Sequence, residues 1–435
     1  MSATFIIFVS ILVALVLLIL GCPIFVCLGM AGIIGMFLKG GFIQLSLLQT
    51  TVFGSISTFT LVAVPLFILM GEVILRSGIG THLFDAFSRI LHRVPGGLAM
   101  ATVIACAIFG AMCGVSIAAV ASIGVIALPE MLKRGYNPKL AAGAVCAPGA
   151  LAMMIPPSLL FILYGEVARV SVAKLFMAGI VPGILLAFMM CLYIAFCEII
   201  SPSGANLQES ESLTIKEFFL LIKKVWPSIL LIIGVLGSIY LGIATPTESA
   251  AIGVLGAYFI AIAVYRTMDW QSFRETLTEA GKITTMIFLV FVGAVIFSQF
   301  LNLMRVPDSL AYFISSLHLS PWMKMICIQL MLFFLGMFVD GASMILITTP
   351  ILLPTIYALN WDPIWFGVLM VANIEMAVIT PPVGLNLYAL ASITDAVDME
   401  SILKGTLPYV IVEFLGLLLL IVFPQICLWL PGMMH

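Results

Sequence analysis

Apolar residues occur along this chain in runs that are too long for the core of a water-soluble protein. The longest runs cover residues 5–38, 99–131, 140–164 and 409–430. Each reaches the ~20 residues that an α-helix needs to cross the hydrocarbon layer of a membrane. The composition agrees, because 63% of the 435 residues are hydrophobic and only 9% are charged, against roughly 25% charged residues in a soluble domain. The pattern predicts an all-α, multi-pass membrane protein.

Polar segments separate the apolar runs, and the widest of them, residues 201–224, lies in the middle of the chain and has the composition of a linker. A shift of the sequence on itself by 225 residues brings four prolines onto four others: Pro129 onto Pro354, Pro138 onto Pro363, Pro156 onto Pro381, and Pro157 onto Pro382. A coincidence of this kind without gaps predicts an internal repeat. The expected halves are residues 1–200 and 225–435, joined by the connecting segment 201–224.

One apolar segment in each half is long for a single crossing and short for two. Residues 94–132 and 325–359 have this length, which favours a re-entrant helical hairpin that enters and leaves on one face of the membrane. About five crossings are expected between the hairpins, an odd number, so the second hairpin must enter from the opposite face. Broken helices are expected at about 140–165 and 364–391, and a last span at about 408–430. The predicted fold is an inverted repeat.

The distribution of Lys and Arg predicts the orientation of this fold. Most of these residues fall at 76–139, 216–224, 266–282 and 404. The positive-inside rule places these positions, and with them the connecting segment and the first hairpin, on the cytoplasmic side. The second hairpin is then periplasmic. A net charge of −2 without a basic stripe gives no reason to expect nucleic acid as a partner.

Backbone inside a membrane can depart from the helix only where protein or a water-filled cavity satisfies its polar groups. Four such breaks are expected: GVS (114–116), DGAS (340–343), APGALAMMIPPS (147–158) and TPPVGLN (380–386). They form pairs under the same shift of 225 residues. Free N–H groups at the starts of half-helices suit a carboxylate, and free C=O groups at their ends suit a cation.

Asp340 is an ionisable residue in an otherwise apolar run, which costs at least ~2.5–3.5 kcal/mol at the centre of a bilayer. A bound cation would offset this cost. The hydroxyl and amide oxygens at the breaks are hard ligands, so sodium is the expected ion and no transition metal or other cofactor is expected. The alternatives are that Asp340 caps its own turn and that the serines bind backbone carbonyls. Glu375, also within an apolar segment, is expected either to contact the second hairpin or the site or to make a buried structural pair.

Two other acidic residues are given purely local roles by their spacing. Glu72 stands one helical turn before Arg76, which predicts an ion pair between them. Glu248 follows Thr245 at an apparent helix start, which predicts a cap.

Four longer motifs resemble one known family. They are VPLFILMGEVILRSGI (64–79), IPPSLLFILYG with SVAKLFMAGIVPG (155–183), GIATPTESAAIG (242–253) and TPPVGLNLY (380–388). In this order they resemble the large membrane subunit of TRAP (tripartite ATP-independent periplasmic) transporters, the DctM-like family, over essentially the whole chain. The resemblance implies an elevator-type carrier of the ion transporter superfamily, in which a domain with both hairpins moves past a static scaffold. It also implies sodium-driven uptake of an organic carboxylate, such as a C4-dicarboxylate, a sialic acid or another sugar acid.

The same resemblance implies partners, a location and a set of site residues. The partners are a small four-helix (Q-type) membrane subunit and a periplasmic (P-type) substrate-binding protein, and the location is the bacterial inner membrane. By this similarity the sodium-binding residues are expected to be Gly114, Ser116, Asp340, Ser343, Thr380 and Asn386. The substrate-binding residues are expected to be Ser116, Ala150, Pro157, Ser158, Pro382 and Gly384.

Two other functions compete with this interpretation. One is a stand-alone sodium- or proton-coupled anion carrier of the same superfamily, which needs no binding protein. The other is a membrane enzyme, and it is disfavoured because the sequence has no HExxH motif, no intramembrane Ser/His pair and no twin intramembrane aspartates. The chain is therefore not expected to be an enzyme.

Overall fold

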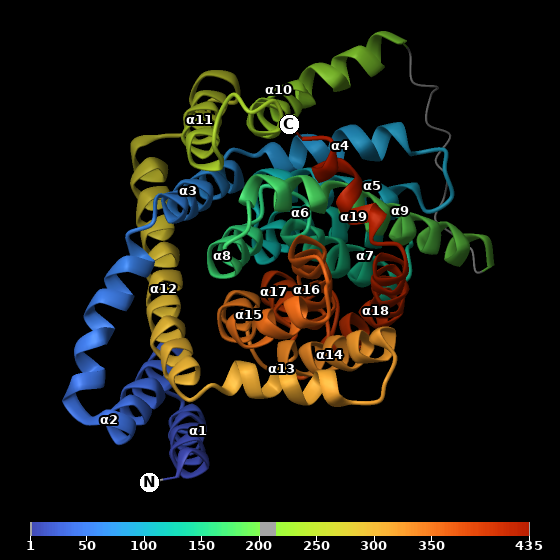
Figure 1. Ribbon diagram of the computed structural model, residues 1–435. Coiled ribbons are helices and arrows are strands. Elements are labelled where there is room, and N and C mark those ends of the chain that lie inside the picture. Colours follow the sequence, from blue (N-terminus) through green and yellow to red (C-terminus); the bar gives the residue numbers. More distant parts are fainter. Residues whose placement is uncertain (1, 201–214, 435) are drawn as a thin grey trace.

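Helices form the whole regular structure of the described part of this chain. The computed structural model describes residues 2–200 and 215–434, with the side chains of 215–220 and 222 excepted. Most of the expected connecting segment, residues 201–214, lies outside the described residues. Figure 1 shows a frame of helices along three sides of the molecule and a compact bundle inside it.

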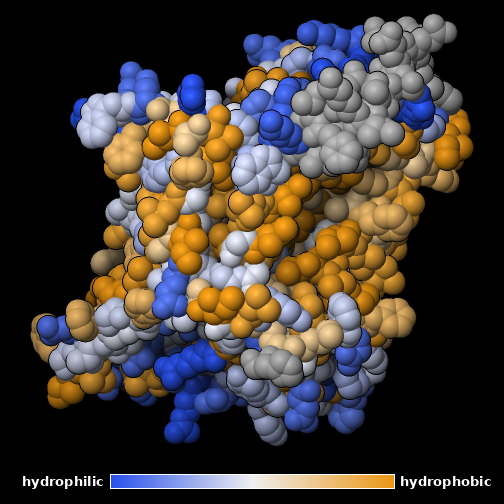
Figure 2. All heavy atoms as spheres, turned by 90° about the horizontal axis from the view of Figure 1, so that it is seen from above, coloured by the Kyte–Doolittle hydropathy of each residue, from blue (hydrophilic) through white to orange (hydrophobic). Residues whose placement is uncertain are grey.

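Nine helices within the described residues are long and apolar enough to cross a membrane. They are Ile24–Ile56, Phe59–Arg76, Ser116–Lys133, Val172–Ile200, Lys223–Tyr240, Pro246–Val264, Trp270–Leu303, Gly341–Ala358 and Met399–Val422. Figure 2 views the end of the molecule that carries α4, α10 and α11, and hydrophobic atoms cover much of the surface even there. These observations confirm the prediction of an all-α, multi-pass membrane protein.

The frame contains the helices that precede the hairpin in each half. In the first half they are α1 (Ala3–Ile19), α2 (Ile24–Ile56), η1 (Phe59–Val62), α3 (Ala63–Arg76) and α4 (Ile79–Ile90). In the second half they are α10 (Ile215–Tyr240), α11 (Pro246–Phe259), a π-helical turn η3 (Ile260–Val264), α12 (Trp270–Leu303) and α13 (Val306–Ser316). α2 packs closely along α12. A Cβ at Gly293 would lie 2.5 Å from the carbonyl oxygen of Phe25, so only glycine permits this approach.

The bundle contains two similar sets of helices. The first set is α5 (Gly97–Cys113), α6 (Ser116–Lys133), α7 (Pro138–Ala150), η2 (Leu151–Met153), α8 (Leu159–Ala168) and α9 (Val172–Ile200). The second set is α14 (Pro321–Gly336), α15 (Gly341–Ala358), α16 (Pro363–Val378), α17 (Leu385–Ile393), α18 (Met399–Val422) and α19 (Gln425–Gly432). In each set the first two helices form a hairpin and the next pair forms a broken helix.

The two sets of helices confirm the repeat. A shift of 225 residues carries the first and last residues of α6 onto the first and last residues of α15, and the first residue of α7 onto that of α16. The contacts repeat as well: α6 packs on α17 as α15 packs on α8, and α7 packs on α18 as α16 packs on α9. In Figure 1 the α5–α6 hairpin lies in the upper part of the bundle and the α14–α15 hairpin in the lower part. The fold is therefore the predicted inverted repeat of hairpins and broken helices.

Corresponding caps begin the two broken helices. Asn137 precedes Pro138 and its side-chain oxygen accepts the N–H of Lys139 at 2.9 Å, and Asp362 precedes Pro363 and accepts the N–H of Ile364 at 2.7 Å. An Asx cap followed by proline suits a helix start, because proline at the first position lacks only an N–H that would have no partner. The repeated motif thus fixes where each broken helix begins.

One local prediction is wrong and another is confirmed. Arg76 does not form the predicted pair with Glu72, because its guanidinium contacts the carboxylate of Glu275 on α12 at 2.6 Å. This contact joins α3 to α12 across 199 positions of sequence, which helical spacing cannot reveal. Glu248 caps α11 as predicted, since its carboxylate accepts the N–H of Thr245 at 2.8 Å and the Thr245 hydroxyl accepts the N–H of Glu248.

Candidate functional site

The tip of the first hairpin lies directly against the first helix break. α5 ends at Cys113 and is capped by Gly114, which has a φ of +65°, and a Cβ at Gly114 would lie 2.6 Å from the carbonyl oxygen of Pro157. Only glycine fits this position, because it alone adopts positive φ without strain and brings no side chain into the contact. α6 then begins at the buried Ser116. Gly114 and Pro157, predicted from separate motifs, are therefore neighbours.

The tip of the second hairpin lies against the second break in the same way. The N–H of Val383, which follows the Pro381–Pro382 pair, donates to the carbonyl oxygen of Met337 at 3.3 Å. Asp340 caps α15: its carboxylate accepts the N–H of Ser343 at 3.1 Å and also the Ser343 hydroxyl proton. The structure thus brings Asp340 and Ser343 together, and the carboxylate performs the capping role that the sequence left as an alternative.

The helices that flank each break also contact the opposite repeat. The side-chain amide of Asn386, near the start of α17, donates to the carbonyl oxygen of Cys146 on α7 at 3.1 Å. The hydroxyl of Tyr164 on α8 donates to the carbonyl oxygen of Pro363 at the start of α16 at 2.6 Å. Gly341 at the second tip faces Leu160 of α8. All four breaks therefore form one interlocked centre within the bundle.

The remaining predicted residues occupy the two breaks. The Ser158 hydroxyl donates to the carbonyl oxygen of Met153, and the Thr380 hydroxyl donates to that of Met376 at 2.6 Å. Ala150 is the buried last residue of α7, and Gly384 caps α17 with a φ of +53°. Pro382 is exposed. The hydroxyls of Ser158 and Thr380 thus satisfy free backbone carbonyls.

The oxygen atoms of this centre fit a hard cation. Asn386 is fully buried, and its side-chain oxygen has no hydrogen-bond partner among the described residues. A buried polar atom without a partner costs roughly 1–3 kcal/mol, so this oxygen needs a donor or a cation. The carboxylate of Asp340 and the carbonyl groups at the ends of the half-helices are further hard ligands.

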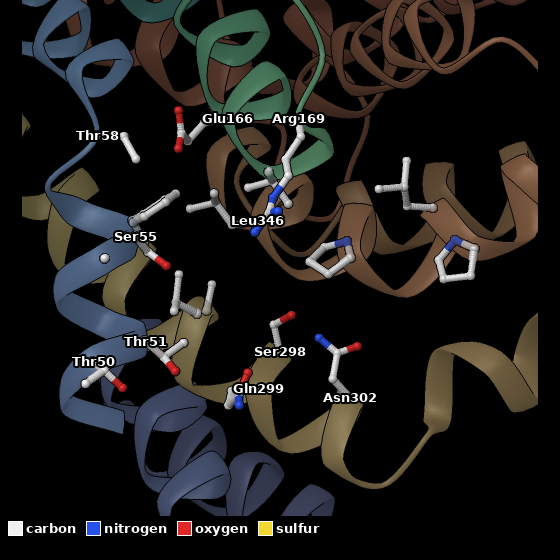
Figure 3. Close-up of a pocket in the computed structure, with 18 of the residues that line it drawn as sticks. Thr50, Thr51, Ser55, Thr58, Glu166, Arg169, Ser298, Gln299, Asn302 and Leu346 are labelled. Carbon is white, nitrogen blue, oxygen red and sulfur yellow. The ribbon is translucent and has the colours of Figure 1, made fainter. Parts of the chain in front are cut away.

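A crevice of about 950 Å³ separates the frame from the bundle (Figure 3). We call it the interface crevice. Its frame side carries Thr50, Thr51, Ser55 and Thr58 from α2 and the loop after it, and Ser298, Gln299 and Asn302 from α12. Glu166 and Arg169 at the end of α8 and the apolar face of α15 close the opposite side. None of the predicted site residues lines this crevice.

Comparison with known proteins places the chain in a family. Residues 11–426 match the model of the family described as "Tripartite ATP-independent periplasmic transporter, DctM component". The chain belongs to this DctM family. The family resemblance of the four motifs is confirmed.

Related DctM-family permeases differ in the substrates that their names give. The chain is 35% identical to the C4-dicarboxylate TRAP transporter large permease protein DctM of Pseudomonas aeruginosa, over 86% of both chains. It is 31% identical to the sialic acid TRAP transporter large permease protein SiaM of Vibrio cholerae, over 87% of both. It is 32% identical to the isethionate TRAP transporter permease protein DctMQ of Oleidesulfovibrio alaskensis, over 95% of this chain and 65% of that one. The chain is therefore a TRAP large permease and not an enzyme.

A solved structure supports the fold of this DctM permease. The crystal structure of the Alcanivorax borkumensis YdaH transporter, whose title reports an unusual topology, matches with a TM-score of 0.64 at 14% identity and covers 88% of this chain and 89% of its own. At this identity the likeness concerns the fold alone.

Sequence reasoning missed the polar lining of the interface crevice in this permease. Thr51, Ser55 and Thr58 recur at helical spacing on one side, and Ser298 and Asn302 stand one turn apart on the other. This periodicity within apolar runs was a usable signal. Arg169 carried no comparable signal, because it follows α8 in a polar segment and its side chain enters the crevice only in the folded chain.

A second missed residue is Glu413. Glu375 on α16 is fully buried and Glu413 on α18 is 2% exposed, and neither carboxylate has a hydrogen-bond partner among the described residues. The two carboxylates are close enough to interact electrostatically. Glu413 interrupts the apolar run 409–430, which was the available signal. Glu375 thus lies near another acid, whereas the sequence left open whether it contacts the second hairpin or the site or makes a structural pair.

Proposed function

We propose that this permease takes up an organic carboxylate across the bacterial inner membrane, driven by a sodium gradient. In this proposal the bundle of α5–α9 and α14–α19 moves as an elevator against the frame. One observation carries the proposal: the tips of the two hairpins contact the two helix breaks in a bundle that a polar crevice separates from the frame. Interrupted helices at a repeat interface are where carriers of this kind bind substrate and coupling ions.

Sodium is the coupling ion in this proposal because the ligands are hard oxygens. Asn386, Asp340 and the carbonyl groups at the ends of α5 and α7 would hold it. The ion would share the centre with the substrate, whose carboxylate would receive the free N–H groups at the starts of α6 and α8. Ser116 and Ser158 begin or cap these half-helices. Binding of one ligand then favours the other through opposite charge.

Arg169 adds a reason to favour an anionic substrate. Among the described residues it is the only cationic one that lines the interface crevice, and its guanidinium points into that space (Figure 3). A guanidinium can bind a carboxylate through two parallel hydrogen bonds. The names of related permeases include C4-dicarboxylate and sialic acid, and both classes carry carboxylates.

Substitution Arg169→Gln should raise the KM for the carboxylate about 10-fold to 100-fold, because a hydrogen bond to a charged group contributes ~1.5–3 kcal/mol. The maximal uptake rate and the sodium dependence should change little. The control is Arg305→Gln, because Arg305 also has a positive φ of 55° but stands at the start of α13, outside the crevice. Initial uptake rates at varied substrate concentration measure both. An equal rise of KM in the two variants would remove Arg169 from the substrate path.

The proposed partners follow from the family. A tripartite transporter with a periplasmic component implies a soluble binding protein that delivers the substrate and a small membrane subunit. The name DctMQ of a related permease that is longer than this chain supports a Q-type partner.

Uptake into proteoliposomes tests the whole proposal. The permease, the small subunit and the binding protein are reconstituted together and offered labelled C4-dicarboxylate or sialic acid. Uptake should require all three proteins and an inward sodium gradient. Transport by the permease alone, without the binding protein, would contradict the tripartite proposal.

The second candidate is a stand-alone proton-coupled carrier, and the buried pair Glu375 and Glu413 favours it. Buried carboxylates without a cationic partner mark proton pathways in membrane carriers. The same vesicles distinguish the two functions, because a proton gradient without sodium would then drive uptake by this chain alone.

A further inference from the structure

A basic cavity of about 510 Å³ lies beside α4 and the N-terminal part of α10, and no hairpin-tip residue is among its described lining residues. Its lining includes Arg89 of α4 and Lys223 and Lys224 of α10. We call it the basic cup. No acidic residue is among its described lining residues, and none of the three cations forms an ion pair within the described part of the chain. Three cations around one cavity, none of them in an ion pair with a described residue, favour an anionic ligand.

Specific contacts hold the wall of the basic cup in place. The hydroxyl of Tyr265 donates to the carbonyl oxygen of Lys224 at 2.7 Å, and the Tyr265 ring stacks on His82 with centroids 4.8 Å apart. Burial and the Lys224 ammonium lower the pKa of His82, although Asp85 acts in the opposite direction. The ring is therefore neutral at pH 7, and the charge of the cup comes from Arg89, Lys223 and Lys224.

An apolar groove of about 200 Å³ continues from the basic cup. It runs between α10 and α11 and is lined by Trp226, Leu230 and Gly234 on one side and Ile252 and Phe259 on the other. We call it the apolar groove. Val264 lines both the cup and the groove, so the two spaces adjoin at this residue. Leu230 is 58% exposed and Phe259 is 65% exposed, which leaves the groove open at the surface.

We propose that the basic cup and the apolar groove together bind one anionic phospholipid. The phosphate would lie among Arg89, Lys223 and Lys224, and an acyl chain would lie along the apolar groove. Basic pockets between membrane helices recognise anionic headgroups in this way. Trp226, which lines the groove and follows Lys224 closely in sequence, is of the residue type usual at the membrane interface. This site goes beyond the proposed transport function and does not depend on it.

Charge complementarity decides between this occupant and a helix of a partner protein. An apolar partner helix could fill the apolar groove, but without acidic residues it would leave the three cations in the adjoining cup without counter-charge. A phospholipid satisfies both regions with one molecule, because its charge and its chain are joined over a short distance. The bound lipid would belong to the leaflet that adjoins the basic cup and would lie next to the frame helices α10 and α11.

Displacement of a fluorescent phosphatidylglycerol from the detergent-solubilised full chain tests the proposal. Unlabelled phosphatidylglycerol should displace it at least ~10-fold better than phosphatidylcholine of the same chains. Inorganic phosphate should not displace it, because phosphate cannot fill the apolar groove. Equal displacement by the two lipids, or displacement by phosphate alone, would overturn the proposal.

Two variants separate the two halves of the site. The triple variant Arg89→Gln, Lys223→Gln and Lys224→Gln should lose about 100-fold of its affinity for phosphatidylglycerol and bind both lipids alike. Gly234→Leu should weaken both lipids equally and keep their ratio, because a Cβ at Gly234 meets no atom within 4 Å and the longer side chain would fill the groove. Retained affinity in Gly234→Leu, with loss of a co-purifying small membrane subunit, would assign the groove to that subunit.

A control of equal charge excludes a general electrostatic effect. Lys133, Lys139 and Arg274 are exposed, do not line the basic cup and are predicted on the same side of the membrane. Their combined change to Gln should leave the preference for phosphatidylglycerol unaltered. A loss as large as that of the cup variant would show that the preference comes from net charge and not from this site.

Discussion

Substitution Asp340→Asn should abolish sodium-dependent uptake while the protein still folds and inserts. Asparagine caps a helix as well as aspartate does, so the bond from the Ser343 N–H is retained. Only the negative charge is lost, and with it the strongest proposed sodium ligand at the second hairpin tip. The apparent sodium affinity should fall at least ~100-fold. Uptake at graded sodium concentrations measures the effect.

Two further variants complete the test of Asp340. Asp340→Ala, which removes charge and cap together, should lose uptake to the same extent and also lose ~1 kcal/mol of stability. Asp308→Asn is the control, because this exposed acid lies in the first turn of α13. If Asp340→Asn transports normally and only Asp340→Ala fails, the carboxylate is a cap and takes no part in sodium binding.

Substitution Gly114→Ala should reduce uptake at least ~10-fold by displacing the first hairpin tip from the first break. An L-residue at positive φ costs ~1–2 kcal/mol. The new methyl group would also stand 2.6 Å from the carbonyl oxygen of Pro157, which is backbone and cannot rotate away. Overpacking of this kind costs a further ~1–3 kcal/mol. Uptake kinetics and thermal unfolding of the purified variant measure the two consequences.

Gly135→Ala provides a matched control for the backbone strain. Gly135 lies in the turn between α6 and α7 with a φ of +84°, and a Cβ there meets no atom within 4 Å. This variant should lose a similar amount of stability from strain and keep its uptake. Equal losses of uptake in the two variants would mean that strain alone, and not the contact with Pro157, limits transport.

The sequence revealed the helix breaks of this permease but not the contacts that are made at them. Both helix breaks were predictable because proline cannot continue a helix and because Pro156–Pro157 and Pro381–Pro382 recur at the spacing of the repeat. The contact of Gly114 with Pro157 was not predictable, because it depends on how the hairpin folds back on the bundle. The last apolar run forms two helices, α18 and α19, because the chain turns at Phe423 before Pro424.

The sequence by itself determined that the chain crosses a membrane many times, that it is built from two related halves, and that each half has a hairpin and a broken helix. These features follow from the lengths of apolar runs and from the positions of proline and glycine, which act locally on the backbone. The tertiary structure alone decided which groups meet: Arg76 with Glu275, Asn386 with Cys146, Glu375 near Glu413, and Arg169 with the interface crevice. Such contacts join residues that are far apart along the chain. They depend on how helices cross and rotate against each other, and that is set by the packing of whole surfaces and not by any local pattern.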